Sequence, residues 1–289
     1  MGKSGKNIKK PLLITALVLL IAVFITSGAI VIFQTVRNAK ENQAFDDLKK
    51  RIGASESSSK PSGSKFEIHI GDGEEDSGEA ESPEGAVTEA EEEAPEGEDI
   101  TGRYDELYAE NSDLFGWITI EGTKIDYPVM HTPDNPEYYL HRSFQKKYSA
   151  SGVPFMDAKC YVGCGNYLLF GHHMKNGTMF AGLMDYRKED FWKEHKTVIF
   201  DTLEERGEYE IMAAFYAKIY LTTDTDVFRW YNYTDLTDEA VFNEYIAGVE
   251  AAKLYDTGIT AEFGDELLTL STCGKDSTQR FVVVAKRVK

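Results

Sequence analysis

The N-terminal region contains the feature that most restricts what this chain can fold into. Residues 11–33 carry no Asp, Glu, Lys or Arg, and the ten residues before them carry four lysines and no acid. A run of 23 uncharged residues is long enough to cross the hydrocarbon core of a bilayer as a helix. The lysines predict that residues 1–10 stay in the cytoplasm and that the chain after Phe33 lies outside.

A cleaved signal peptide is the alternative interpretation of the same run. The segment Thr26-Ser27-Gly28-Ala29 has the small side chains that are typical of a cleavage site. The apolar region of a signal peptide is usually shorter, however, and here the apolar residues continue to Phe33. We therefore predict that residues 11–33 form an uncleaved transmembrane anchor and that the protein crosses the cell membrane once.

A strongly acidic segment follows the predicted anchor. Between Phe66 and Ile100 there are 15 Asp or Glu and no Lys or Arg, so this stretch supplies most of the chain's net charge of −18. The Ser- and Gly-rich sequence before it is typical of a flexible linker. We predict that residues 34–100 form a disordered acidic stalk, with an acidic interaction tail as the alternative. The folded domain then occupies residues 101–289, and nothing in its charge predicts nucleic-acid binding.

Short β-rich runs dominate the predicted folded domain. Turn residues separate about eight of them, which indicates a mainly β protein whose strands form a closed or nearly closed barrel without exposed edges. Helices are expected at residues 103–111, in one or two short turns at 180–195, and at 237–253 with Thr237 as N-cap. The expected strands are residues 116–120, 125–130, 152–156, 167–172, 197–200, 209–220, 266–271 and 281–287.

The chain has three cysteines, and an odd number leaves at least one free thiol in an exported domain. Cys160 and Cys164 lie four residues apart in "CYVGC", and Cys273 is distant from both. A disulfide between Cys160 and Cys164 and a pair of free structural thiols both remain open. We predict no metal site there, because neither a histidine nor a second cysteine pair lies near in the sequence.

Cys273 ends the apolar run "LLTLSTC" and is a candidate nucleophile. A thiol attacks carbonyl groups as the thiolate, so it needs a base or a positive charge nearby. Among the six histidines, His172 directly follows an apolar run and a glycine, in "LLFGHHMKNGTMF". Arg280 opens the next apolar run after a hairpin-length loop, so it should lie opposite Cys273. Its guanidinium could hold a developing oxyanion, or it could simply pair with a surface acid.

Taken together, these stretches resemble the sortases, most closely class B. That family has a TLxTC strand, a Gly-His pair about a hundred residues earlier, and an arginine on the following strand, and here the order is the same. "GWITIEGTKIDYPVM", "YYLHRSF" and "GVPFMD" are also similar to class B catalytic domains. The resemblance extends from about residue 104 to 288. It implies a sortase-type barrel in which the segment between residues 220 and 267, with its helix, is the extended loop before the cysteine strand.

The resemblance also implies a role for each matching residue. Cys273 corresponds to the nucleophile, His172 to the general acid and base, and Arg280 to the residue that binds the oxyanion. Ser271 and Thr272 match positions that help to line the substrate groove. Asp276 lies three residues after the cysteine, and we assign it no role.

The implied activity is that of a membrane-anchored cysteine transpeptidase of a Gram-positive-type surface, with its catalytic domain outside the cell. It would cleave a C-terminal sorting pentapeptide of exported proteins, of the NPxTN or (S/N)PxTG type, after the Thr. The acyl group would then pass to an amino group of a peptidoglycan precursor or to a lysine of a pilin. No cofactor or metal is implied. The alternatives are a hydrolytic thiol peptidase and a non-catalytic, membrane-tethered barrel that binds peptides.

Overall fold

The computed structural model describes residues 9–58, 98–273 and 278–289. The chain divides into two compact units, Met1–Ala54 and Ser55–Lys289.

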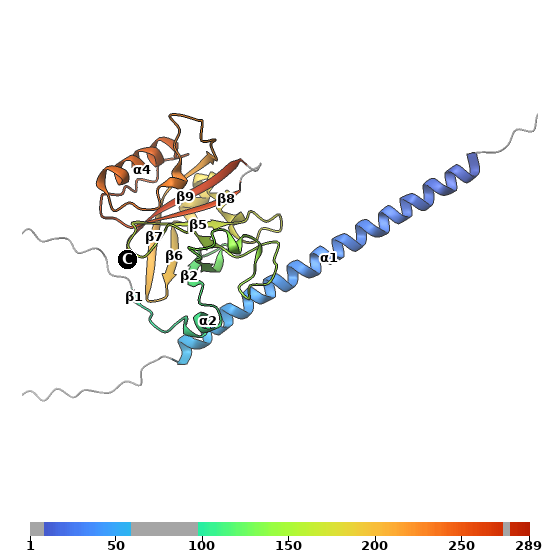
Figure 1. The fold of residues 1–289 in the computed structure, drawn as a ribbon, viewed down its shortest axis with the longest axis horizontal. Helices are drawn as coiled ribbons and strands as arrows, with labels where there is room; N and C mark the ends of the chain where they lie inside the picture. Colours follow the sequence, from blue (N-terminus) through green and yellow to red (C-terminus); the bar gives the residue numbers. More distant parts are fainter. Residues whose placement is uncertain (1–8, 59–97, 274–277) are drawn as a thin grey trace, which may run out of the picture. The chain divides into compact units, whose positions relative to one another are not determined.

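The described part of the N-terminal unit is helical throughout and belongs to one long helix, α1 (Lys9–Ser58), drawn in blue in Figure 1. This helix contains the uncharged run predicted to be a membrane anchor. Within the described part of the chain, α1 is the one helix that is long and apolar enough to cross a membrane. The predicted helix is therefore confirmed, and its length and composition fit a single membrane span.

The structure differs from the sequence prediction for the first part of the stalk. Residues 34–58 continue α1, whereas residues 34–100 were predicted to be disordered. The physical reason is local: residues 34–52 contain neither Gly nor Pro and are rich in Ala, Gln, Glu, Lys and Arg, which favour helices. The charge of the acidic stretch after Phe66 hid this signal. The rest of the predicted stalk, residues 59–97, lies outside the described residues.

The second unit is a mixed β-barrel of eight strands with one short additional strand at its edge (Figure 1). The strand order is β1-β7-β6-β2-β3-β4-β5-β8-β9, and pairing of β7 with β9 closes the barrel. The predicted closed barrel is thus confirmed. The strands are β1 (Glu98–Asp99), β2 (Leu114–Thr119), β3 (Asp126–Met130), β4 (Phe155–Met156), β5 (Asn166–Gly171), β6 (Thr197–Thr202), β7 (Glu205–Lys218), β8 (Leu267–Cys273) and β9 (Gln279–Arg287).

Two parallel pairings interrupt the otherwise antiparallel barrel. They join β3 to β4 and β5 to β8, and the second brings together strands about a hundred residues apart in the sequence. Parallel strands need a long crossover connection. Here the chain between β5 and β8 supplies it, and this connection includes two other strands of the barrel, β6 and β7.

Short helices occupy the connections: all three predicted regions contain helix, and two further short 3₁₀ helices were not predicted. Helix α4 begins one residue after its N-cap Asp238, whose Oδ1 accepts a hydrogen bond from Val241 N at 3.1 Å. Thr237 was the predicted cap, but its own hydroxyl donates to Asp235 Oδ1 instead. The helices are α2 (Asp105–Glu110), η1 (Tyr138–His141), η2 (Phe180–Arg187), α3 (Glu189–Glu194), η3 (Trp230–Asn232) and α4 (Glu239–Ala252).

Different groups of side chains pack against the inner and the outer face of the barrel wall. Aromatic rings fill the interior, where the Phe200 ring lies 5.5 Å from Tyr167 and 6.4 Å from Tyr209 between centroids. The segment between β7 and β8, which carries η3 and α4, contacts the outward-facing residues of β5 and β8. The Trp230 ring contacts Phe170 of β5, and Tyr245 OH lies 2.6 Å from Thr269 Oγ1 of β8.

Candidate active site

The hairpin of β8 and β9 places Cys273 directly opposite Arg280. The two residues form the last antiparallel pair of the ladder, as the loop length between them predicted. Positions 269, 271 and 273 alternate with the interior positions of β8, and Thr269 faces outward toward α4. Cys273 and Arg280 therefore occupy cross-strand positions on the wall covered by the segment between β7 and β8.

Strand β9 lies between β8 and β7, and on the β7 side Arg280 pairs with Ala217. An alanine at this cross-strand position leaves space beside the longer side chain on the same face. The guanidinium of Arg280 is partly exposed, and its Nη1 donates to the carbonyl of Gln279 at 3.0 Å. It is thus a cation at the rim of the barrel, adjacent to the strand end that carries Cys273.

The parallel pairing of β5 with β8 brings His172 to the same place. Its last pair is Gly171 with Thr272, so the residues that follow, His172 and Cys273, are neighbours at the ends of adjacent strands. Gly171 is required here because a Cβ at this position would lie 2.5 Å from the Phe180 ring. The peptide after it is held by Phe180 N, which donates to His172 O at 3.0 Å.

Ser271 and Thr272, predicted to line the substrate groove, are both buried, at 0% and 1% exposure. Thr272 Oγ1 donates to the carbonyl of Gly171 at 2.9 Å, which fixes the register of β5 against β8 one residue before His172 and Cys273. Ser271 Oγ is buried without a hydrogen-bond partner among the described residues. Neither side chain is open to a peptide in this structure, and their contact with substrate stays a prediction.

The His172 imidazole is half-buried, and one of its nitrogens has a defined partner. Nε2 lies 2.8 Å from the carbonyl oxygen of Leu140, next to the end of η1. A carbonyl oxygen can only accept, so Nε2 carries a hydrogen and Nδ1 is the basic nitrogen of the neutral ring. Burial lowers the pKa of His172, and the positive charge of His141 lowers it further, while the Leu140 carbonyl opposes both effects.

The other two cysteines lie at the opposite end of β5. Cys160 and Cys164 are free and buried, and both Sγ atoms lie 3.3 Å from the carbonyl oxygen of Asn166. The interaction with Cys164, together with burial, raises the pKa of Cys160, so this thiol stays protonated. Of the two possibilities left open by the sequence, the structure has the pair of free thiols. A protonated, buried thiol is a poor nucleophile.

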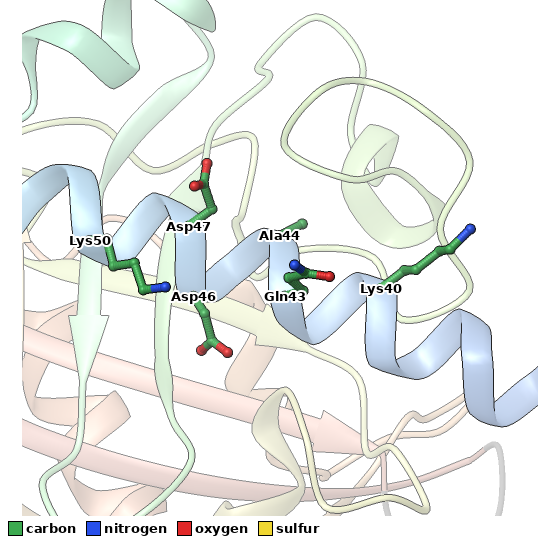
Figure 2. A pocket seen from close by; sticks show the side chains of 6 residues that line it. All are labelled: Lys40, Gln43, Ala44, Asp46, Asp47 and Lys50. Atoms are coloured by element: carbon green, nitrogen blue, oxygen red, sulfur yellow. The ribbon is translucent and has the colours of Figure 1, made fainter.

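A hollow lies on the surface of the N-terminal unit, and no predicted catalytic side chain lines it. Figure 2 shows the six residues of α1 that line it, with Asp46 and Asp47 pointing to opposite sides of the helix. None of the six is a cysteine or histidine, so this hollow has no part in the site. Elsewhere in the described ranges, no three His, Cys, Asp or Glu side chains are grouped as a metal site would require.

Sequence reasoning missed the contribution of η1. Leu140 supplies the carbonyl bonded to His172, and the His141 ring lies against the His172 ring with centroids 5.4 Å apart. No periodic pattern can reveal a 3₁₀ helix of four residues, and nothing in the sequence spacing connects it to a histidine some thirty residues later. The one available signal was a histidine within "YYLHRSF", a segment that carried part of the resemblance.

The comparisons with known proteins match this geometry. A family model described as the sortase domain matches residues 118–288. Sortase B of Staphylococcus aureus is 30% identical over 199 residues, 66% of this chain and 77% of the relative. Sortase B of Listeria monocytogenes is 33% identical over 186 residues, 62% and 71% of the two chains. A solved complex of S. aureus sortase B with substrate superimposes with a TM-score of 0.57, at 29% identity, and covers 65% of this chain and 85% of that chain.

Proposed function

Since this chain belongs to the sortase family, we propose that it is a membrane-anchored class B transpeptidase with Cys273 as nucleophile, His172 as general acid and base, and Arg280 as oxyanion ligand. The register of the three strand ends is the observation that supports these roles most directly. Cys273 pairs with Arg280, and the parallel pair Gly171–Thr272 precedes His172 and Cys273.

The reaction begins when the Cys273 thiolate attacks the carbonyl carbon of a threonine in the sorting peptide. A carbon–sulfur bond forms, and the carbonyl oxygen becomes negatively charged. Arg280 stabilises this oxyanion, because its planar guanidinium offers donors in a fixed fork and the residue is paired across the ladder with Cys273. The carbon–nitrogen bond then breaks, and His172 protonates the leaving amine. The products of this half-reaction are a thioester on Cys273 and a free peptide amine.

In the second half-reaction, an amino group attacks the thioester. His172, now neutral, removes a proton from this amine, and the carbon–sulfur bond breaks to restore the thiolate. Because Nε2 of His172 is bonded to the Leu140 carbonyl, Nδ1 carries the proton in both half-reactions. Burial lowers the pKa of His172, which makes its protonated form a stronger acid toward the leaving group. These steps need no metal or organic cofactor.

The similarity to class B sortases supports a proposal for the substrates. S. aureus sortase B has been solved as a complex with its substrate. For this chain we propose a sorting pentapeptide of the NPxTN or (S/N)PxTG type as acyl donor. The acceptor is the amine of a peptidoglycan precursor or a pilin lysine. Ser271 and Thr272 lie at the end of the β8 strand that borders the proposed groove, and they shape it through the position of that strand.

The N-terminal helix provides the anchor. Residues 11–33 span the cell membrane, residues 1–10 remain in the cytoplasm, and residues 34–100 connect the span to the domain outside. Protease added to intact cells should then release the domain of residues 101–289. Recovery of a protected full-length chain would contradict this topology.

A pentapeptide library offered to the full-length protein, with and without an added amine, tests the activity itself. Cleavage after Thr, with a new amide bond to the amine, is the expected result by mass spectrometry. Cleavage that yields only free acid in the presence of amine would favour the hydrolytic peptidase. Binding without cleavage would favour the non-catalytic barrel and overturn the proposal.

A further inference from the structure

We propose that His141 is a positioning residue for His172, whose ring it holds by stacking and whose positive charge it opposes with its own. The proposal rests on the acid–base role given above to His172. It goes beyond that role by adding a second histidine, which touches neither the peptide nor the reacting atoms.

The first supporting observation is the arrangement of the two rings. Their centroids are 5.4 Å apart, and their planes meet at 26°. This is within the range of offset-stacked aromatic pairs, so the contact restricts rotation of the His172 ring about its χ angles. His172 is half-buried, whereas His141 is exposed to solvent at the end of η1.

The second observation is that η1 contacts His172 twice. The Leu140 carbonyl accepts from Nε2 at 2.8 Å, and the next residue supplies the stacked ring. The hydrogen bond fixes one nitrogen, and the ring contact fixes the plane. Together they determine the direction in which Nδ1 points. The short helix is itself held in place, because Val153 N donates to Tyr139 O and Ser149 N donates to His141 O.

The third observation concerns charge. Burial is the main cause that lowers the pKa of His172, and the charge of His141 adds to it. Other titratable groups belong to the elements around His172, but His141 is the one charged side chain with a resolved effect on it within the described part of the chain. These other groups are Cys273 on β8, Arg280 on β9, Asp185 and Arg187 on η2, and the neighbouring His173.

The stacking and the charge can be separated by substitution. His141→Phe keeps an aromatic ring against His172 and removes the charge. His141→Ala removes both. His195→Phe is the control, because His195 is a partly exposed histidine whose ring packs against an aromatic side chain, Phe191. It is the C-cap of α3, and no contact with His172 is found among the described residues.

The first experiment titrates the His172 ring by NMR in the full-length chain in detergent, with ¹³C at the Cε1 of every histidine. The His172 signal is identified by its absence in His172→Asn. In His141→Phe and His141→Ala its midpoint should move to higher pH, because an opposing charge has been removed. In His195→Phe it should stay at the wild-type value. An unchanged midpoint in His141→Phe would overturn the electrostatic part of the proposal.

The second experiment measures peptide turnover. His141→Phe should keep kcat near the wild-type value at its own optimum, with the pH limb set by His172 moved upward. His141→Ala should lower kcat by up to about 10²-fold, since a misplaced acid–base group costs that much, while KM stays the same. Equal kcat in the Phe and Ala variants would overturn the positioning part.

The NMR titration requires no substrate, so the two proposals can fail separately. If His172 shifts as expected but the wild-type protein cleaves no peptide, then the transpeptidase assignment is wrong and the coupling of the two histidines stands. If peptide is transferred but the midpoint does not move, the enzyme assignment stands and the electrostatic role of His141 is wrong.

Discussion

Strand β9 carries an arginine near each end, and the two differ in almost every contact. Arg287 lies among acids: its Nη1 is 2.9 Å from Glu205 Oε1 and 3.1 Å from Glu266 Oε1. Tyr209 also donates to Glu266 Oε1, at 2.5 Å. Arg280, seven residues earlier, pairs across the ladder with Cys273 and Ala217 and donates to a backbone carbonyl.

Both residues are arginines on the same strand, yet their contacts differ. The residues that surround each arginine, and not its type or its strand, therefore determine its role. Burial alone would lower the pKa of Arg287, but the neighbouring Glu205, Tyr209 and Glu266 raise it overall. The charge of Arg287 therefore stabilises the contacts among β7, β8 and β9. At the other end, Arg280 is paired across the ladder with Cys273. One end of β9 thus carries an ion-pair network, and the other carries the residue proposed to bind the oxyanion.

The largest expected effect belongs to Cys273, the proposed nucleophile at the Arg280 end. Cys273→Ala should lower peptide turnover on the order of 10⁶-fold, to the detection limit, as loss of a catalytic nucleophile does in other enzymes. Cys160→Ala and Cys164→Ala should leave most of the turnover, because both thiols are buried at the opposite end of β5. Mass spectrometry after treatment with a thiol-reactive peptide should locate the adduct. An adduct on Cys160 would contradict the assignment of Cys273 as the nucleophile.

Substitution of Arg280 should have the next largest effect. Lysine keeps the charge but has a flexible stem in place of the planar fork. Arg280→Lys and Arg280→Ala should each lower kcat by about 10²–10³-fold, roughly 2.7–4 kcal/mol, with lysine the milder. The melting temperature should hardly change, because this side chain lies at the rim. Steady-state kinetics and thermal unfolding on the same samples check both statements. Turnover near wild type in Arg280→Lys would mean that only charge matters.

The same substitution at the other end of β9 should give the reverse result. Arg287→Lys and Arg287→Ala lose contacts to Glu266, which is largely buried, and to the more exposed Glu205. A broken, partly buried network of this kind should cost about 1–3 kcal/mol of unfolding free energy. Denaturant unfolding measures this loss, and kcat/KM below the melting temperature should be unchanged. A large loss of kcat/KM in folded Arg287→Lys would show that the Arg287 end of β9 also contributes to activity.

The smallest effect concerns acid stability. Burial lowers the pKa of His172 and also that of His131. A histidine with a lowered pKa in the folded state contributes stability that is complete above its unfolded pKa of about 6.5. This stability is lost as pH falls through the folded value. His172→Gln should therefore flatten the decline in melting temperature below pH 6.5. A slope identical to wild type would argue against burial of a neutral ring.

Much of the barrel could be predicted from the sequence, because strand alternation and turn residues are local signals. The opposition of Cys273 and Arg280 followed from the short loop between two apolar runs, and the register confirms it. Strand ends were less accurate: β7 begins at Glu205, four residues before the expected start, because Gly207 and the charges around it hide the strand pattern.

The parts that could not be predicted depend on contacts between distant segments or on a masking composition. The contact of η1 with His172 arises only when the barrel closes, so neither Leu140 nor His141 could be assigned to the site. The extension of α1 through residues 34–58 was not predicted, because these residues were grouped with the acidic stretch that follows them.

The hydrogen bond from Thr272 to Gly171 joins residues that are 101 positions apart in the chain. Pairings of such long range are slow to form, because the entropy of closing a large loop must be lost before any contact repays it. β8 is also among the last strands to be synthesised. The growing polypeptide therefore contains no assembled cysteine–histidine pair until its final residues have docked. Topology alone therefore delays assembly of the proposed cysteine–histidine pair until β8 has docked against β5.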